Sequence, residues 1–202
     1  IGHGMLFDHM MMDGLEDAYS RDEKGNARSM GTFAEECATE YGLTREAQDA
    51  FAIESVKRAQ AAAKDGGFDW EIAPVTVPGR GGDTVVSIDE GPAKARLEKI
   101  PALKPAFKKD GTITAASSSS INDGAAALVL MRESTANKLG LTIIAKIHGH
   151  ATHAQAPNLF TTAPIGAVKK LYAKTGWSSS NVDLFEINEA FAAVVLSWAQ
   201  VY

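Results

Sequence analysis

The residues with the clearest chemical potential form the run Asn188-Glu189-Ala190-Phe191-Ala192. This run directly follows the apolar segment 182–187, which is predicted to be a strand that leads into a helix at Glu189. A side-chain amide at such a junction is held by backbone on both sides, so it can orient a water molecule or donate a hydrogen bond to a developing oxyanion. On spacing alone, an asparagine that caps the helix is the more ordinary interpretation, and both stay open at this point.

Three histidines, His148, His150 and His153, form the pattern His-x-His-x-x-His. The first two lie on one face of a predicted strand and could bind zinc. No carboxylate or cysteine nearby completes a ligand set, so histidines at the end of a sheet are the favoured interpretation. The glycine-rich segment 79–82 follows an edge strand and lacks the lysine of a phosphate loop, which indicates a hairpin turn.

The only cysteine, Cys37, excludes an internal disulfide and favours a cytoplasmic protein. Its neighbours Glu35 and Glu36 oppose formation of a thiolate, so we predict a buried structural thiol rather than a nucleophile. The formal net charge of −5 gives no nucleic-acid footprint. No run of eighteen apolar residues occurs, so no transmembrane helix is predicted.

The pattern along the 202 residues alternates between helices and strands and predicts an α/β protein. Thr44 is a plausible N-cap and Glu46 follows in the first helical turn, which marks the start of the clearest helix. Helical spacing covers residues 5–19, 32–41, 45–64, 133–139 and 165–175. A hairpin is predicted over 72–88, and buried strands are predicted at 125–131, 143–147 and 182–187.

Six sequence blocks, taken in order, resemble the thiolase family. The most specific is Asn188 to Phe191, which matches the family's NEAF motif. The similarity extends over essentially the whole chain, as the middle half of a thiolase. The other blocks are Asp13-Gly14-Leu15, 42–52, Leu103-Lys104-Pro105-Ala106-Phe107, 111–127 and Thr162-Ala163-Pro164.

The resemblance implies a layered αβαβα sandwich, present here in part, with an inserted loop domain. Residues 1–113 would form the loop domain that covers coenzyme A, 114–145 the end of the N-terminal core and 146–202 the start of the C-terminal core. The implied reaction is acyl transfer to or from acetyl-CoA through a cysteine acyl-enzyme, as in fatty acid metabolism and β-oxidation. The implied partners are acetyl-CoA or another acyl-CoA, and a second copy in a homodimer or homotetramer, with no nucleic acid, no membrane, no metal and no separate cofactor.

Roles in catalysis carry over to the positions that match the family's motifs. Asn188 would hold the water that stabilises the enolate of acetyl-CoA, and Glu189 would support the turn rather than react. Phe191 and Met30 would line the acyl pocket.

Coenzyme A contacts carry over in the same way. Ala115 and Ser119 resemble the positions that bind the pantetheine arm, whereas Phe107 and Leu15 resemble its apolar walls. The basic residues Lys94, Arg96 and Lys99 would meet the 3′-phosphate or form a solvated face; both readings stay open.

Several departures from the family pattern bear on activity. The nucleophilic cysteine, the GHP histidine and the second cysteine have no counterpart in these residues, so we expect a fragment that is inactive by itself. Ser29, Ser117 and Ser120 stand where the family frequently has His, Asn and Gly. Alternatives to a thiolase are a non-catalytic acyl-CoA or lipid-binding relative, against which the intact Asn188 argues, and an inactive fragment.

Overall fold

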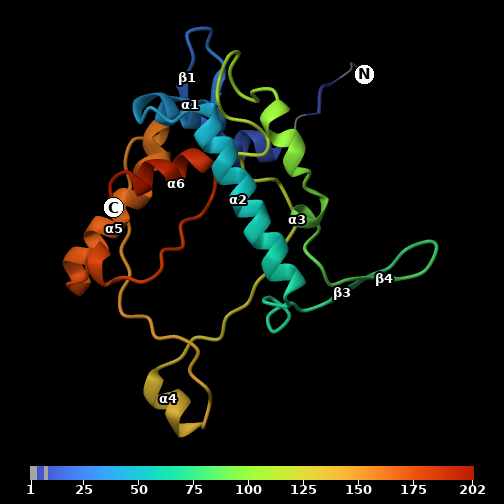
Figure 1. The fold of residues 1–202 in the computed structure, drawn as a ribbon, viewed down its shortest axis with the longest axis vertical. Coiled ribbons are helices and arrows are strands. Elements are labelled where there is room, and N and C mark those ends of the chain that lie inside the picture. Colours follow the sequence, from blue (N-terminus) through green and yellow to red (C-terminus); the bar gives the residue numbers. More distant parts are fainter. Residues whose placement is uncertain (1–3, 7–8) are drawn as a thin grey trace.

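The computed structural model describes residues 4–6 and 9–202, which form a helical body with two short hairpins and a separate projection around α4 (Figure 1). The helices are α1 (Met30–Glu40), α2 (Arg45–Lys64), α3 (Glu90–Lys94), α4 (Glu133–Lys138), α5 (Ala163–Thr175) and α6 (Ala192–Ala199). The strands are β1 (Glu16–Arg21), β2 (Ala27–Ser29), β3 (Val75–Val77) and β4 (Thr84–Val86). Short helical turns lie at η1 (Met11–Leu15), η2 (Leu97–Ala102), η3 (Pro157–Thr162) and η4 (Ser179–Asn181).

Helices α1 and α2 confirm the predictions made from local signals. The Thr44 side chain accepts a hydrogen bond from the amide of Ala47 at 3.1 Å, so it caps α2 as expected. Gly42 follows α1 in a left-handed conformation with φ of 61°, which a residue without a Cβ adopts at little cost. The predicted helices at 133–139 and 165–175 correspond to α4 and α5.

The predicted helical spacing over 5–19 is wrong for its second half. Residues 7–8 lie outside the described residues, and only Met11–Leu15 form a π-helical turn. Residues 16–21 are instead the strand β1, which pairs antiparallel with β2 across the charged turn at 22–26. This pairing satisfies backbone groups that local spacing does not predict, so the tertiary partner overrides the local pattern.

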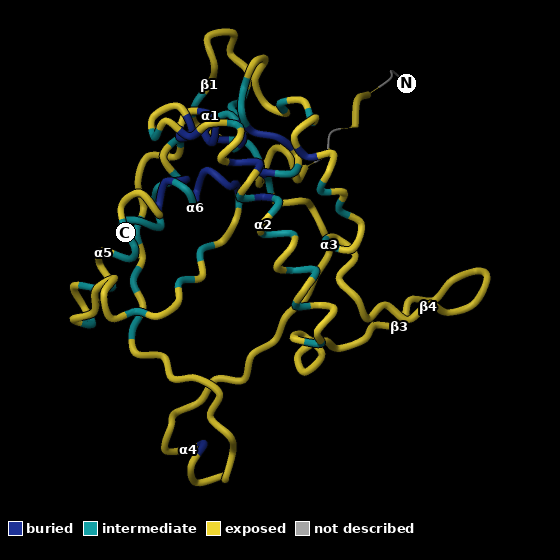
Figure 2. The backbone as a smooth tube through the Cα atoms, in the orientation of Figure 1, coloured by how far each residue is buried: buried dark blue, intermediate teal, exposed yellow. Residues whose placement is uncertain are grey.

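The strands β3 and β4 confirm the predicted hairpin and pair antiparallel, with Val75 opposite Val86. Together they project from the body as an arm that is exposed along its length (Figure 2).

The three predicted buried strands at 125–131, 143–147 and 182–187 are not formed. Within the described part of the chain, the two sheets are the pairs β1–β2 and β3–β4. The apolar side chains are exposed accordingly: Leu128 is 88%, Val129 87% and Ile144 83% exposed. A strand needs neighbours on its edges and cover on its faces, and these residues supply neither.

The hydrophobic core lies where α1, α6 and the segment at Ile113 meet. Its buried residues are Ala34, Cys37, Ala38, Leu43, Ile113, Phe191, Ala193 and Val194. In Figure 2 the buried part of the backbone is concentrated in this upper region, whereas the projection around α4 is largely exposed. Among the residues described, no helix has both the length and the apolar content required to span a membrane.

Candidate active site

A cavity of about 700 Å³ lies between helix α2 and two segments that are distant in sequence. One wall is formed by residues of the 89–103 segment, including Arg96, Lys99 and Ile100. The opposite wall is formed by Ala115 to Ser120, with Glu189 and Ala192 beside it. Two of the residues predicted to contact coenzyme A, Ala115 and Ser119, therefore line the same cavity.

Backbone hydrogen bonds join the serine wall to the start of α6. The amide of Ser119 donates to the carbonyl of Ala190 at 3.0 Å, and the amide of Ala192 donates to the carbonyl of Ser117 at 2.9 Å. Ser118 and Phe191 form an antiparallel bridge between these bonds. This short ladder fixes the position of the run that contains Asn188 relative to the cavity.

Glu189 receives hydrogen bonds at both its backbone and its side chain. The Ser119 hydroxyl donates to the Glu189 carbonyl at 2.6 Å. The Ser55 hydroxyl, which comes from α2, donates to the Glu189 carboxylate at 2.7 Å. These contacts support the turn at Glu189, the role that the family resemblance implies for it.

Asn188 lies on the exposed side of this turn, four residues before α6 begins. The N-cap of α6 is Phe191, so the interpretation of Asn188 as a helix cap is wrong, as is the predicted helix start at Glu189. The Asn188 side chain therefore does not cap the first turn of α6.

An aromatic group adjoins this turn. The Phe191 ring lies edge-on to Phe107, with 5.9 Å between centroids, and 6.3 Å from Phe160. Phe160 in turn meets Phe33 at 6.4 Å. Met30 packs against the core that includes Phe191, so three of the predicted site residues, Met30, Phe107 and Phe191, lie in one region.

Sequence reasoning missed Phe160 and Phe33 because their contacts join segments far apart in the chain. Phe160 belongs to η3 and lies two residues before the Thr162-Ala163-Pro164 block, and its nearness to this block is the signal that could have found it. Leu15 ends η1 and is half-buried, but it is not part of the cavity lining. The predicted residues therefore fall into two groups. Ala115 and Ser119 line the cavity, Met30, Phe107 and Phe191 lie in the aromatic region, and Leu15 belongs to neither group.

A buried carboxylate anchors the segment that leads to Ala115. Glu35, on α1, is 5% exposed and accepts hydrogen bonds from the amides of Thr112 at 2.9 Å and Ile113 at 2.9 Å. Gly111 passes so close to this carboxylate that a Cβ there would overlap it. The position of residues 111–115 is therefore set by helix α1.

The basic residues at the cavity differ in their partners. Lys94 forms an ion pair with Glu90, and its hydrogen bond and charge hold the pKa of the Glu90 carboxyl below its usual range. Arg96 and Lys99 line the cavity on the same side. Cations on this wall suit an anionic ligand such as a phosphate.

The cysteine and the histidines lie away from the cavity. Cys37 is 4% exposed and its sulfur lies 4.0 Å from the carbonyl of Ala193, which confirms the prediction of a buried thiol. His148 packs against Trp177, whereas His153 bonds to the Gln155 side chain at 3.1 Å. No group of three or more His, Cys, Asp or Glu side chains that could hold a metal occurs within residues 4–6 and 9–202.

Comparison with known proteins identifies the family. The sequence matches the thiolase N-terminal domain over residues 1–134 and the thiolase C-terminal domain over residues 141–201. The chain belongs to the thiolase family. It is 48% identical over 199 residues to the protein named acetyl-CoA acetyltransferase 2 of Arabidopsis thaliana, covering 97% of this chain and 48% of that protein. The chain thus spans about half the length of such curated relatives.

Solved structures of thiolases superpose closely on the chain. The Bacillus anthracis acetyl-CoA acetyltransferase matches with a TM-score of 0.90 at 38% identity, over 100% of this chain and 50% of that one. A thiolase of Ascaris suum, solved in complex with coenzyme A, matches with a TM-score of 0.88 at 40% identity, over 99% of this chain and 50% of that one. The fold is therefore the thiolase fold in part, as the sequence predicted.

Proposed function

We propose that the chain is the coenzyme A-binding part of an acyltransferase of the thiolase type. The reaction transfers an acyl group to or from acetyl-CoA, by condensation or by thiolysis of a 3-oxoacyl-CoA. The observation that supports this most directly is the cavity between the 89–103 segment and the serine wall, which brings Ala115 and Ser119 beside the Glu189 turn. Residues 1–113 then act as the loop domain over the coenzyme, 114–145 end the N-terminal core and 146–202 begin the C-terminal core.

The cavity has the features that a coenzyme A thioester needs. Coenzyme A joins a phosphorylated nucleotide to a long, uncharged pantetheine arm. The cations Arg96 and Lys99 lie on one wall, and the small residues Ala115 and Ser119 lie on the other. A ligand that runs from the cations past the serine wall brings its thioester to the turn at Asn188 and to the aromatic group, where Phe107 provides an apolar wall and Met30 and Phe191 adjoin the acyl chain. Leu15 lies apart from this path.

The chemistry assigns distinct tasks to this chain and to the rest of the polypeptide. In condensation, C2 of acetyl-CoA loses a proton to a base, and the resulting enolate attacks the carbonyl carbon of a cysteine-bound acyl group. The new carbon–carbon bond forms as the carbon–sulfur bond to the cysteine breaks, and the cysteine sulfur takes up a proton. Asn188 orients the donor to the enolate oxygen, and one such preorganised donor lowers the barrier by about 3–4 kcal/mol.

The nucleophile comes from residues outside these 202. Cys37 is buried in the core, where its sulfur is closed off from a thioester in solvent. This observation also favours the second candidate function for the chain by itself, which is binding of acyl-CoA without turnover.

We also propose that the intact protein forms a homodimer or homotetramer, acts in fatty acid metabolism including β-oxidation, and is cytoplasmic. The last proposal rests on a single cysteine, which leaves no internal disulfide.

Isothermal titration of the 202-residue chain with coenzyme A tests the binding proposal. The change Ala115→Trp fills the cavity and is expected to weaken binding at least about tenfold. The matched control is Ala61→Trp, on an exposed face of α2 outside the cavity lining. Equal affinity of the two variants would place the ligand elsewhere.

Catalysis is tested in the polypeptide that also carries the nucleophile. There, Asn188→Ala is expected to lower kcat by about 10²–10³. Cleavage of a 3-oxoacyl-CoA by the 202-residue chain alone would contradict the assignment of the nucleophile to other residues.

A further inference from the structure

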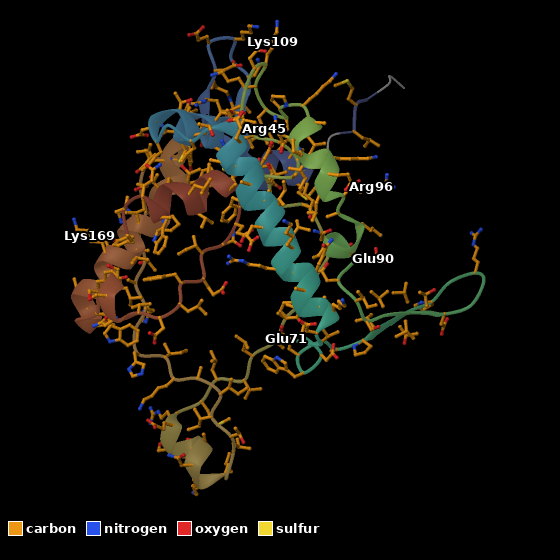
Figure 3. All side chains as sticks on the ribbon, in the orientation of Figure 1. Arg45, Glu71, Glu90, Arg96, Lys109 and Lys169 are labelled. Carbon is orange, nitrogen blue, oxygen red and sulfur yellow. The ribbon has the colours of Figure 1, made fainter. Side chains whose placement is uncertain are left out.

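Helix α2 begins with a residue that its own helix disfavours. Arg45 occupies the first position of α2, where the helix dipole carries partial positive charge and an acidic side chain is preferred. A cation at the positive end of a helix is unfavourable by itself, so we expect contacts with other parts of the fold to compensate for it. Figure 3 labels Arg45 at the N-terminal end of α2 and Arg96 on the neighbouring segment.

The Arg45 guanidinium bonds to two parts of the molecule at once. Its Nε donates to the Asp49 carboxylate at 2.8 Å, one turn further along α2. Its Nη2 donates to the carbonyls of Leu103 at 2.8 Å, Ile100 at 3.2 Å and Pro101 at 3.4 Å. The group is largely covered, since the side chain of Arg45 is 21% exposed and that of Asp49 is 8% exposed.

The three carbonyls belong to the end of η2, which is a wall of the cavity. A cation close to the last carbonyls of a helix is stabilising. Two of the three residues that Arg45 holds, Ile100 and Leu103, line the cavity, as does Lys99 beside them. Besides the Arg45 bonds, η2 is held by the burial of Ile100, which is 4% exposed. The preceding helix α3 has its own bond to α2, from the Gln60 side chain to the carbonyl of Pro92 at 2.8 Å.

We propose that Arg45 is a positioning residue for the coenzyme A cavity, and the proposal rests on the proposed function for its ligand. Arg45 touches no ligand; it fixes η2 against α2 and thereby sets the separation between the cationic wall and the serine wall. Lysine cannot replace it fully, because a single ammonium cannot bond to Asp49 and to three carbonyls in the fixed geometry of a guanidinium. Asp49 holds the fork in the orientation that reaches η2.

Amide hydrogen exchange on the ligand-free chain tests the positioning itself. In Arg45→Gln, the amides of Lys99 and Leu103, which bond within η2, are expected to exchange at least about tenfold faster. The amide of Gly176 at the end of α5 is the internal reference and should not change. The matched control is Arg58→Gln, on the same helix, whose guanidinium pairs with Glu54 in solvent.

Titration with coenzyme A tests the consequence for the cavity. At a temperature where all variants are folded, Arg45→Gln is expected to weaken binding at least about tenfold and Arg45→Lys by less, with Arg58→Gln within about twofold of the unchanged chain. A role in stability alone would lower the unfolding temperature of Arg45→Gln and leave the dissociation constant unchanged, and that result would overturn the proposal.

The two measurements separate the two proposals. If the unchanged chain binds no coenzyme A, the proposed function fails for this chain, while the exchange comparison still decides whether Arg45 positions η2. Unchanged exchange at Lys99 and Leu103 in Arg45→Gln would overturn the inference even if the chain binds coenzyme A.

Discussion

Replacing Glu35 by alanine should strongly destabilise the chain. The Glu35 carboxylate is buried and accepts from the amides of Thr112 and Ile113 and from the Thr112 hydroxyl at 3.3 Å. Ile113 is fully buried, so its amide finds no water when the carboxylate is removed. A hydrogen bond to a charged group contributes about 1.5–3 kcal/mol, so the loss of both bonds to the amides lowers the free energy of unfolding by about 3–6 kcal/mol.

Urea unfolding followed by circular dichroism measures this change. With an m-value of about 2 kcal/mol/M, the midpoint for Glu35→Ala should fall by about 1.5–3 M. The matched control is Glu36→Ala, which removes the neighbouring carboxylate on the same helix. The Glu36 side chain is 52% exposed and pairs with Arg28 at the surface, so its removal should cost less than about 1 kcal/mol.

The comparison between the two glutamates is decisive. If Glu35→Ala is no more destabilising than Glu36→Ala, the segment at 111–115 is held by something other than the Glu35 carboxylate, and the account of how helix α1 positions Ala115 is refuted.

Two further predictions concern the edges of the site. Gly31→Ala places a Cβ in overlap with the Phe107 ring and should lower the free energy of unfolding by about 1–3 kcal/mol in the same urea assay. The control is Gly14→Ala, whose added Cβ meets no atom within 4 Å and so overlaps nothing. Equal effects of the two changes would contradict the packing argument. The pKa of the Asp17 carboxyl is held below its ordinary value of 3.8, first by the hydrogen bond from the Ser20 hydroxyl and then by that from the Tyr19 amide. This interaction therefore stabilises the fold above the unfolded pKa and is lost as the pH falls through the folded pKa. An NMR titration should place the Asp17 midpoint below 3.8 and Ser20→Ala should raise it, while a midpoint at or above 3.8 would count against the bonded geometry.

The parts of the fold that could be predicted from sequence are those with local causes. Helix α2 has an N-cap at Thr44 and glycines after its end, and both signals act within a few residues. The apolar pattern at 125–131 is typical of a strand inside a sheet, and such a strand needs partner strands, which residues 4–6 and 9–202 do not form. The prediction of a buried strand there is therefore wrong for the described residues, because a local pattern does not show whether partner strands are present.

The residues of the candidate site also differ in whether the sequence could predict them. Ala115 and Ser119 were placed by motif resemblance, and both line the cavity. Phe160 and Arg45 were missed because their partners lie far along the chain. An arginine at the first position of a helix was a visible irregularity, but its reason, the carbonyl groups of η2, exists only in the folded structure.

The bond from the Ser119 hydroxyl to the Glu189 carbonyl has a consequence for the order of folding. It joins residues 70 positions apart. Closing a loop of that length costs about 4 kcal/mol in chain entropy beyond a constant term, so this contact should form after the local contacts of α1 and α2. The few hydrogen bonds between residues 117–119 and 190–192 recover little of that cost. This pairing is therefore expected to open before the helices α1 and α2 unfold. The turn that carries Asn188 would then be the last part of the site to assemble, when a ligand or neighbouring strands hold the two segments together.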